Sequence, residues 1–165
     1  MTGTELHYMS IADASALIGA KKLSPVEYTE ALIARAEALN PLLDAFVLPT
    51  PEVALAQAQK AEEEIFADDY RGPMHGIPFA LKDIYDTAEI RTTAHSKQLA
   101  NNVPKEDATT VRKLLDSGAV LMGKLATHEF AHGGPTLDLI FPPARNPFRW
   151  CYRLPFEVPP GRSGT

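Results

Sequence analysis

Residues 72–83 read GPMHGIPFALKD and join a turn-rich segment to a short strand that ends on charged residues. The glycines and prolines indicate turns without a helix, and Phe79–Leu81 is an apolar run that predicts a strand leading into Lys82. A sheet positions a lysine at a strand end and can partly desolvate it, which lowers its pKa and lets it act as a base. Spacing alone favours a simpler interpretation, in which a surface lysine pairs with Asp83 or Asp86.

Two helices are predicted in the first forty residues. Ser10 and Asp13 can cap a short helix over Ala14–Ile18. Ser24 is followed by a proline at the first helical position and an acid at the third, which is a strong start signal. Apolar residues then recur at helical spacing, and we expect this second helix to end at Asn40-Pro41.

Strands and helices alternate in the rest of the chain. Ala45–Leu48 predicts a strand, and Pro51–Phe66 predicts a helix whose repeated alanines indicate close packing. A further helix is expected to be capped by Asp107 and stopped by Gly118, and Ala119–Met122 predicts a buried strand after it. This order predicts an α/β fold with a mixed, partly parallel sheet flanked by helices.

Composition narrows the class of protein. The chain has 165 residues, 45% of them hydrophobic and 22% charged, which fits one folded domain or a large piece of one. The net charge of -5 argues against a nucleic-acid or anionic-membrane partner. Cys151 is the single cysteine, so an internal disulfide is excluded and a cytoplasmic location is expected. The N-terminus lacks the pattern of a signal peptide, and no apolar run is long enough to span a membrane.

A zinc-hydrolase motif occurs at residues 128–132, which read HEFAH. On a helix, two histidines four residues apart share a face and can bind zinc, with Glu129 as general base and Glu157 as a conceivable third ligand. Residues 133–135 are glycine, glycine and proline, which would end such a helix at once. We therefore expect no bound metal.

Other candidate sites are weaker. Residues 118–124 have the spacing of a phosphate-binding loop, but Leu125 follows where serine or threonine would bind magnesium, and a buried strand is expected there. His75 and His95 are isolated and are expected to be hydrogen-bonded structural histidines. Cys151 has no neighbouring motif that would support a Cys–His nucleophile.

The Gly72–Asp83 stretch resembles the G-P-L-x-G-I-P-hydrophobic-K-D segment of the amidase-signature family. Further short segments similar to that family's motifs occur in the same order and cover the chain from about Leu23 to Phe148. They are Leu23–Glu27, Leu39–Pro41, Arg91–Ser96, Asp107-Ala108, Ser117–Lys124, Glu129–Ala131 and Ala144–Phe148.

The resemblance implies amide-bond hydrolysis or transfer by a Ser–cis-Ser–Lys triad, with Lys82 as the base. The lysine takes a proton through a bridging serine, which deprotonates the nucleophilic serine, and backbone N–H groups stabilise the oxyanion. The implied substrate is a small-molecule amide, no metal or organic cofactor is needed, and a homo-oligomer is compatible with the sequence. The amidotransferase branch of the family, which works with partner subunits, is an alternative.

Two departures from the family pattern bear on activity. Glu89 stands where the family usually has glycine, and it would strain a turn if that position needs a positive φ. Pro160–Ser163 resembles a degraded P-G-G-S, which would make Ser163 the bridging serine. The family's nucleophile would lie beyond Thr165, so we expect a truncated chain that is inactive as given, and a non-catalytic fragment or pseudoenzyme is a third hypothesis.

The resemblance also predicts how the chain is organised. Residues 1–70 are expected to form an N-terminal helical segment, and residues 71–148 the first part of the amidase-signature α/β core. Residues 149–165 are expected to form a C-terminal tail without counterpart in the family.

Overall fold

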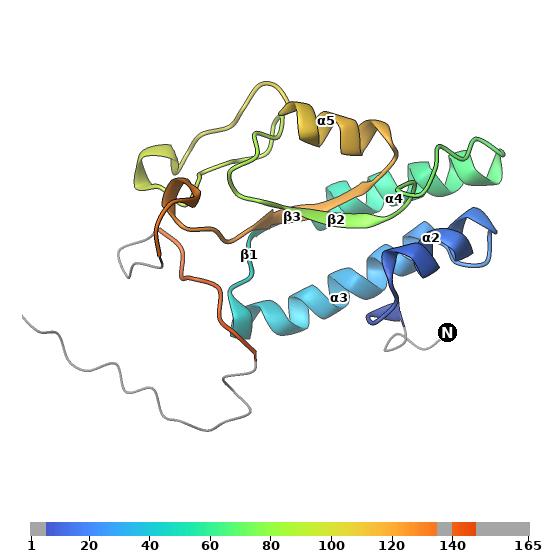
Figure 1. The fold of residues 1–165 in the computed structure, drawn as a ribbon, viewed down its shortest axis with the longest axis horizontal. Coiled ribbons are helices and arrows are strands. Elements are labelled where there is room, and N and C mark those ends of the chain that lie inside the picture. The colour runs from blue at the N-terminus through green and yellow to red at the C-terminus, as the bar shows by residue number, and fades with distance from the viewer. Residues whose placement is uncertain (1–5, 135–139, 148–165) are drawn as a thin grey trace, which may run out of the picture.

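A computed structural model describes residues 6–134 and 140–147 of the chain. Its helices are α2 (Ile11–Gly19), α3 (Pro25–Leu43), α4 (Pro51–Phe66) and α5 (Thr109–Asp116), with short 3-10 turns η1 (Lys97–Leu99) and η2 (Glu129–Ala131). Its strands are β1 (Phe46–Pro49), β2 (Pro78–Lys82) and β3 (Val120–Leu125). Figure 1 shows helices on both faces of the sheet that these strands form. Among the described helices, none is long and apolar enough to cross a membrane.

The sheet has the order β1-β3-β2, with β3 in the centre. β2 and β3 are parallel, whereas β1 is antiparallel to β3. The connection from β2 to β3 passes through α5, as parallel neighbours require. The predicted α/β class with a mixed, partly parallel sheet is confirmed.

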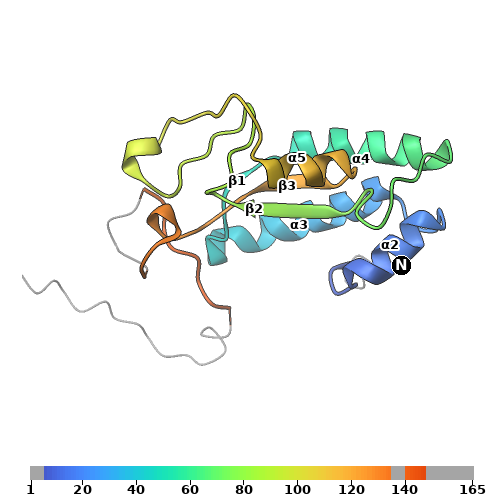
Figure 2. The ribbon, with the colours of Figure 1, turned by 45° about the horizontal axis from the view of Figure 1, so that its top comes forward.

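The central strand β3 is buried because helices cover both of its faces (Figures 1 and 2). On one face Val120 packs with Ala54 and Ala58 of α4, all of them fully buried. On the other face Leu121 packs with Leu81 of β2 and with an apolar residue of α5. The small alanine side chains let α4 approach the sheet closely, as its composition predicted.

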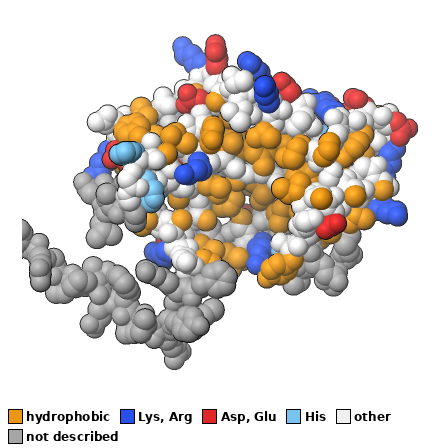
Figure 3. Space-filling model, in the orientation of Figure 1, with side chains coloured by type: hydrophobic (Ala, Val, Ile, Leu, Met, Phe, Trp, Pro, Cys, Tyr) orange, Lys and Arg blue, Asp and Glu red, His pale blue; other side chains and the backbone are white. Residues whose placement is uncertain are grey.

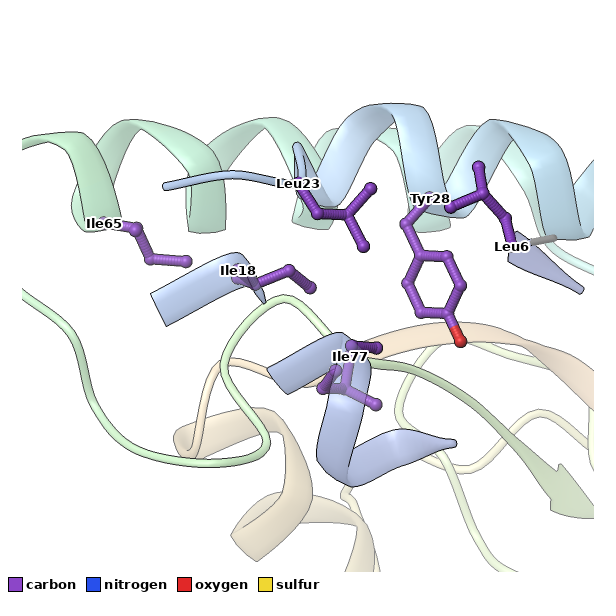
Figure 4. Close-up of a cluster of buried hydrophobic side chains, with 7 residues drawn as sticks. Leu6, Ile18, Leu23, Tyr28, Ile65 and Ile77 are labelled. Carbon is purple, nitrogen blue, oxygen red and sulfur yellow. The ribbon is translucent and has the colours of Figure 1, made fainter. Parts of the chain in front are cut away.

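A second apolar cluster attaches the N-terminal helices to the start of β2. Ile77, which directly precedes β2, packs with buried side chains from α2, α3 and α4, as Figure 4 shows. The buried members of the cluster are Leu6, Ala14, Ile18, Leu23, Tyr28, Ile65 and Ile77. This contact fixes the approach of residues 72–78 to the sheet.

The predicted serine caps are confirmed, although α2 runs from Ile11 to Gly19 and is longer than the predicted Ala14–Ile18. The Ser10 hydroxyl accepts a hydrogen bond from the Asp13 N–H at 3.1 Å, and the Ser24 hydroxyl accepts one from the Glu27 N–H at 3.0 Å. Each serine satisfies an N–H group that the first turn of a helix leaves without an intrahelical partner.

The predicted end of α3 at Asn40-Pro41 is wrong, because the helix continues to Leu43. A proline this close to the end removes one backbone donor without breaking a long helix. The helix ends instead at Asp44, whose N–H still donates to the Asn40 carbonyl at 2.8 Å and whose left-handed φ of 50° turns the chain after it out of the helix. The Asn40 side chain bonds both the N–H and the carbonyl of Phe46, at 2.7 and 3.0 Å, and so places the start of β1.

The predicted capping role of Asp107 is also wrong. Ala108 is the N-cap residue of α5 and makes no side-chain cap. The Asp107 carboxylate accepts instead from the Ala88 N–H at 2.7 Å, so it ties two loops together. Beside it, Glu89 has a φ of 60°, so this position does adopt the conformation that favours the glycine typical of the family.

Gly118 ends α5, as predicted, with a φ of 81°. A Cβ at this position would lie 2.3 Å from Cδ2 of His75. The His75 ring cannot move away easily, because it is fully buried and both of its nitrogens are engaged: Nδ1 accepts from the Arg71 N–H at 3.1 Å, and Nε2 donates to Glu64 at 3.0 Å. Burial lowers the pKa of His75, against a smaller opposing effect of Glu64.

We predict that Gly118→Ala destabilises the protein more than Gly133→Ala. Gly133 has a similar φ of 78°, but no described residue lies within 4 Å of a Cβ added there, so alanine carries only the backbone strain, about 1–2 kcal/mol. Alanine at position 118 adds overpacking against a fixed ring, typically about 1–3 kcal/mol more. Urea unfolding of the two variants measures the difference, and equal losses would contradict the close packing of Gly118 on His75.

Candidate functional site

Lys82 is the last residue of β2, as predicted, and it lies opposite Leu125 of β3. Successive strand residues point to opposite faces. Leu81 points into the cluster under α5, so Lys82 lies on the other face of the sheet. The side chain is exposed there, so the described residues do not provide the predicted partial desolvation. The reason is that β2 is an edge strand, and α4 packs on this face through Val120, near the opposite end of β3.

Figure 3 shows that hydrophobic side chains gather in a broad band across the face seen in Figure 1, over the sheet and its flanking helices. Two of the residues that follow Lys82 are partly exposed and apolar or aromatic, Ile84 at 38% and Tyr85 at 40%. The surroundings of Lys82 are therefore an open surface in the described part of the chain.

Asp83, directly after Lys82, is buried and held from several sides. Its carboxylate accepts from the Thr93 N–H at 3.1 and 3.2 Å and from the Thr93 hydroxyl. Its backbone N–H donates to Leu125 at 2.9 Å, and its carbonyl accepts from the Ala94 N–H at 2.7 Å. Within the described residues no ion pair joins Lys82 to Asp83 or Asp86, so the pairing in the simpler interpretation is wrong, although Lys82 does lie at the surface. The Asp83 carboxylate therefore stabilises the loop that follows β2.

A second lysine, Lys124, is fully buried at the end of β3. Its Nζ donates to the Tyr85 carbonyl at 2.5 Å, to the Thr92 hydroxyl at 2.8 Å and to the Thr87 hydroxyl at 3.0 Å. Burial lowers its pKa, and nearby carboxylates, Asp83 foremost, oppose that effect. This lysine was not among the site residues predicted from sequence, although its place directly after a predicted buried strand was a usable signal.

The two isolated histidines are structural, as predicted. His95 is fully buried; its Nδ1 accepts from the Thr127 N–H at 3.1 Å, so its Nε2 carries the proton and donates to the Phe141 carbonyl at 3.2 Å. His75 packs against Gly118 at the end of α5, as described above. Both rings have their two nitrogens engaged within the protein.

The zinc and phosphate motifs do not have the geometry that their chemistry needs. Between His128 and His132 the chain forms a 3-10 turn in which Phe130 and Ala131 have left-handed φ values of 49° and 56°. The two histidines therefore do not share the face of an α-helix. Among residues 6–134 and 140–147, no group of three or more His, Cys, Asp or Glu side chains could hold a metal ion. Most of the phosphate-loop motif is strand β3.

Three residues considered from sequence lie outside the described residues. They are Ser163, the expected bridging serine, Cys151 and Glu157. The assignment of Ser163 stays a prediction.

The fold and site are those of an α/β protein with a lysine at the end of a parallel strand. The amidase family matches residues 27–152. The chain belongs to this family.

Similar proteins include subunits of glutamyl-tRNA(Gln) amidotransferase. The protein from Geobacter metallireducens is 46% identical over 161 residues, which are 98% of this chain and 32% of that relative. The protein from Carboxydothermus hydrogenoformans is 42% identical over 160 residues, 97% of this chain and 32% of the relative. The chain thus spans about a third of the length of the curated relatives it matches.

Solved structures show the same fold. One is a vestigial protein complex connected with the evolutionary origins of an s-triazine catabolic enzyme, with a TM-score of 0.80 and 30% identity over 85% of this chain and 31% of that chain. Another is the native peptide amidase of Stenotrophomonas maltophilia, with a TM-score of 0.70 and 36% identity over 74% of this chain and 26% of that chain.

We predict that Asp83→Ala destabilises the chain by about 1–3 kcal/mol, because it leaves the buried N–H and hydroxyl of Thr93 without their acceptor. Asp86→Ala is the matched control, since Asp86 is exposed, and its loss is expected to stay within about 0.5 kcal/mol. Urea unfolding measures both values. A loss for Asp83→Ala no larger than that for Asp86→Ala would show that the carboxylate does not hold the loop.

We also predict that purified, chelator-treated protein binds no stoichiometric zinc. The left-handed turn at Phe130 and Ala131 motivates this expectation. Elemental analysis after incubation with zinc and desalting measures it, with His128→Ala as the comparison. About one zinc per chain, lost in His128→Ala, would restore the metal-site hypothesis.

Proposed function

We propose that this chain supplies the lysine base of an amidase-family enzyme that cleaves or transfers amide bonds. The observation that carries the proposal is Lys82 at the end of a parallel strand, inside the segment that resembles the family's lysine motif. The neighbouring residue Asp83 is fixed by hydrogen bonds, so the backbone from which Lys82 extends is rigid.

In the proposed reaction, the neutral amine of Lys82 accepts a proton from a bridging serine. That serine in turn takes the proton of the nucleophilic serine, whose oxygen attacks the amide carbon. Backbone N–H groups stabilise the resulting oxyanion, and the amine leaves with a proton returned through the relay. Water or an amine acceptor then releases the acyl group.

The exposure of Lys82 fits this proposal only if further protein covers it. An amine must be neutral to accept a proton, and burial favours the neutral form of a lysine. The relatives are about three times as long as the matched part. We propose that the remainder of such a protein packs over the Lys82 face, desolvates the amine and supplies the nucleophile.

The amidotransferase branch is a second candidate, favoured by sequence identity. The amidotransferase subunits are 39–46% identical to this chain, whereas the peptide amidase of Stenotrophomonas maltophilia is 36% identical. On this proposal the amide nitrogen is delivered to an acceptor instead of being released to water, and partner subunits take part.

We predict that the purified 165-residue chain does not hydrolyse simple aliphatic or aromatic amides. A base alone cannot form an acyl-enzyme, and the loss of even one oxyanion donor typically lowers turnover about a hundred- to a thousandfold. The assay compares the chain with its Lys82→Ala variant. Turnover that is abolished in Lys82→Ala would show that a nucleophile is present within this chain.

The catalytic assignment itself is tested in a chimera, in which residues 6–147 replace the matching part of the amidotransferase protein from Geobacter metallireducens. We expect the chimera to retain amidotransferase activity and Lys82→Ala to abolish it. Lys113→Ala is the control, because Lys113 is exposed on α5, away from the end of β2. An active Lys82→Ala chimera would contradict the proposed role.

A further inference from the structure

The buried ammonium of Lys124 lies inside the loop that follows Lys82. Its three donors are all used, and the three acceptors are neutral oxygens, those of Tyr85, Thr87 and Thr92. An ammonium group has three donors and no acceptor, so this coordination is complete. An ammonium with all three N–H groups bonded has neither a lone pair to accept a proton nor an N–H left for a substrate, so Lys124 is not an alternative base.

The acceptors are themselves ordered around the ammonium. The Thr87 hydroxyl donates to the Tyr85 carbonyl at 3.1 Å, and the Thr92 hydroxyl donates to the Ile90 carbonyl at 3.2 Å. Each hydroxyl thus donates to the loop backbone and accepts from Lys124. Both threonines are buried, so the loop between residues 84 and 93 is folded around the Nζ atom.

The same loop is closed at its base by Asp83. The carboxylate and the carbonyl of Asp83 bind Thr93 and Ala94, while its N–H binds Leu125, the residue after Lys124. The loop therefore returns to the end of β2 from which it started. Lys82 is the residue immediately before this closure.

A buried charge is an expensive way to stabilise a loop. Removing an ammonium from water carries a penalty of several kcal/mol, and apolar residues of similar volume often stabilise a core as well or better. Three directed hydrogen bonds restrict the loop to one conformation, whereas an apolar side chain would allow several. The buried ammonium therefore specifies the loop conformation more than it stabilises the fold.

We propose that Lys124 is a positioning residue for Lys82: its buried ammonium fixes the 84–93 loop and thereby the end of β2 from which the base extends. This inference rests on the proposed function of Lys82. A misplacement of about 1 Å at a reacting group can lower the rate about a hundredfold. Loss of Lys124 is thus expected to lower kcat while the fold survives.

The first test uses hydrogen–deuterium exchange on the complete 165-residue chain. In Lys124→Met, which keeps the length but not the donors, we expect exchange of residues 84–94 to accelerate at least about tenfold, with α3 and α4 unchanged. Thr92→Val removes one acceptor with little change in shape and is expected to act in the same direction. Lys113→Met is the control. Unchanged exchange over 84–94 in both Lys124→Met and Thr92→Val overturns the proposal, as does uniform acceleration across the whole chain.

The second test measures kcat and KM in the chimera described above. We expect Lys124→Met and Thr92→Val to lower kcat with little change in KM, whereas a variant that is merely less stable lowers only the amount of active enzyme, as measured by active-site titration. If Lys82→Ala leaves the chimera active, the proposed function fails. If Lys82→Ala abolishes activity but both Lys124→Met and Thr92→Val keep the full kcat per active site, the function stands and the positioning role of Lys124 is refuted.

Discussion

The parallel pairing of β2 with β3 is the constraint on which the rest of the structure depends. It places Lys82 beside Leu125 and Leu81 beside Lys124, so one lysine points to each face at the same end of the sheet. One face is closed by α5 and the loop after β2, and the lysine on that side is buried and fully coordinated. The other face is open at this end, and the lysine there is exposed. The register of the β2–β3 pair thus places Lys124 on the buried face and Lys82 on the exposed face.

The packing that holds this register comes from several parts of the chain. Small alanines of α4 let the helix lie close to β3, and Ile77 ties the start of β2 to the N-terminal helices. Beyond β2, the Asp83 carboxylate closes the following loop onto the strand end. The apolar band in Figure 3 and the edge of β2, which has no neighbouring strand among the described residues, are surfaces of the kind that the proposed further protein covers. This fits the length of the relatives, of which the chain spans about a third.

Much of the fold could be predicted because its signals are local. Serine caps at Ser10 and Ser24, the alanine spacing of α4 and the apolar runs of the strands each depend on near neighbours in sequence. The errors arose where contacts outside the local pattern decide the outcome: α3 passes Pro41 because Asp44 and Phe46 fix its end, and Asp107 binds Ala88 instead of capping α5. For the site, sequence placed Lys82 at a strand end but could not show its exposure. It gave no role to Lys124, because the three oxygens around its ammonium come from a loop more than thirty residues earlier in the chain.

If Lys82 is the base that permits acylation, the acyl-enzyme forms only when its amine is present, and trapping that intermediate reveals this. Intact-protein mass spectrometry of the chimera, quenched early during reaction with an amide substrate, reports the acylated fraction before turnover is complete. We expect a mass increase equal to one acyl group in the chimera with Lys82, and no such species in Lys82→Met over the same interval. Acyl-enzyme that forms equally fast in Lys82→Met would show that Lys82 is not the base.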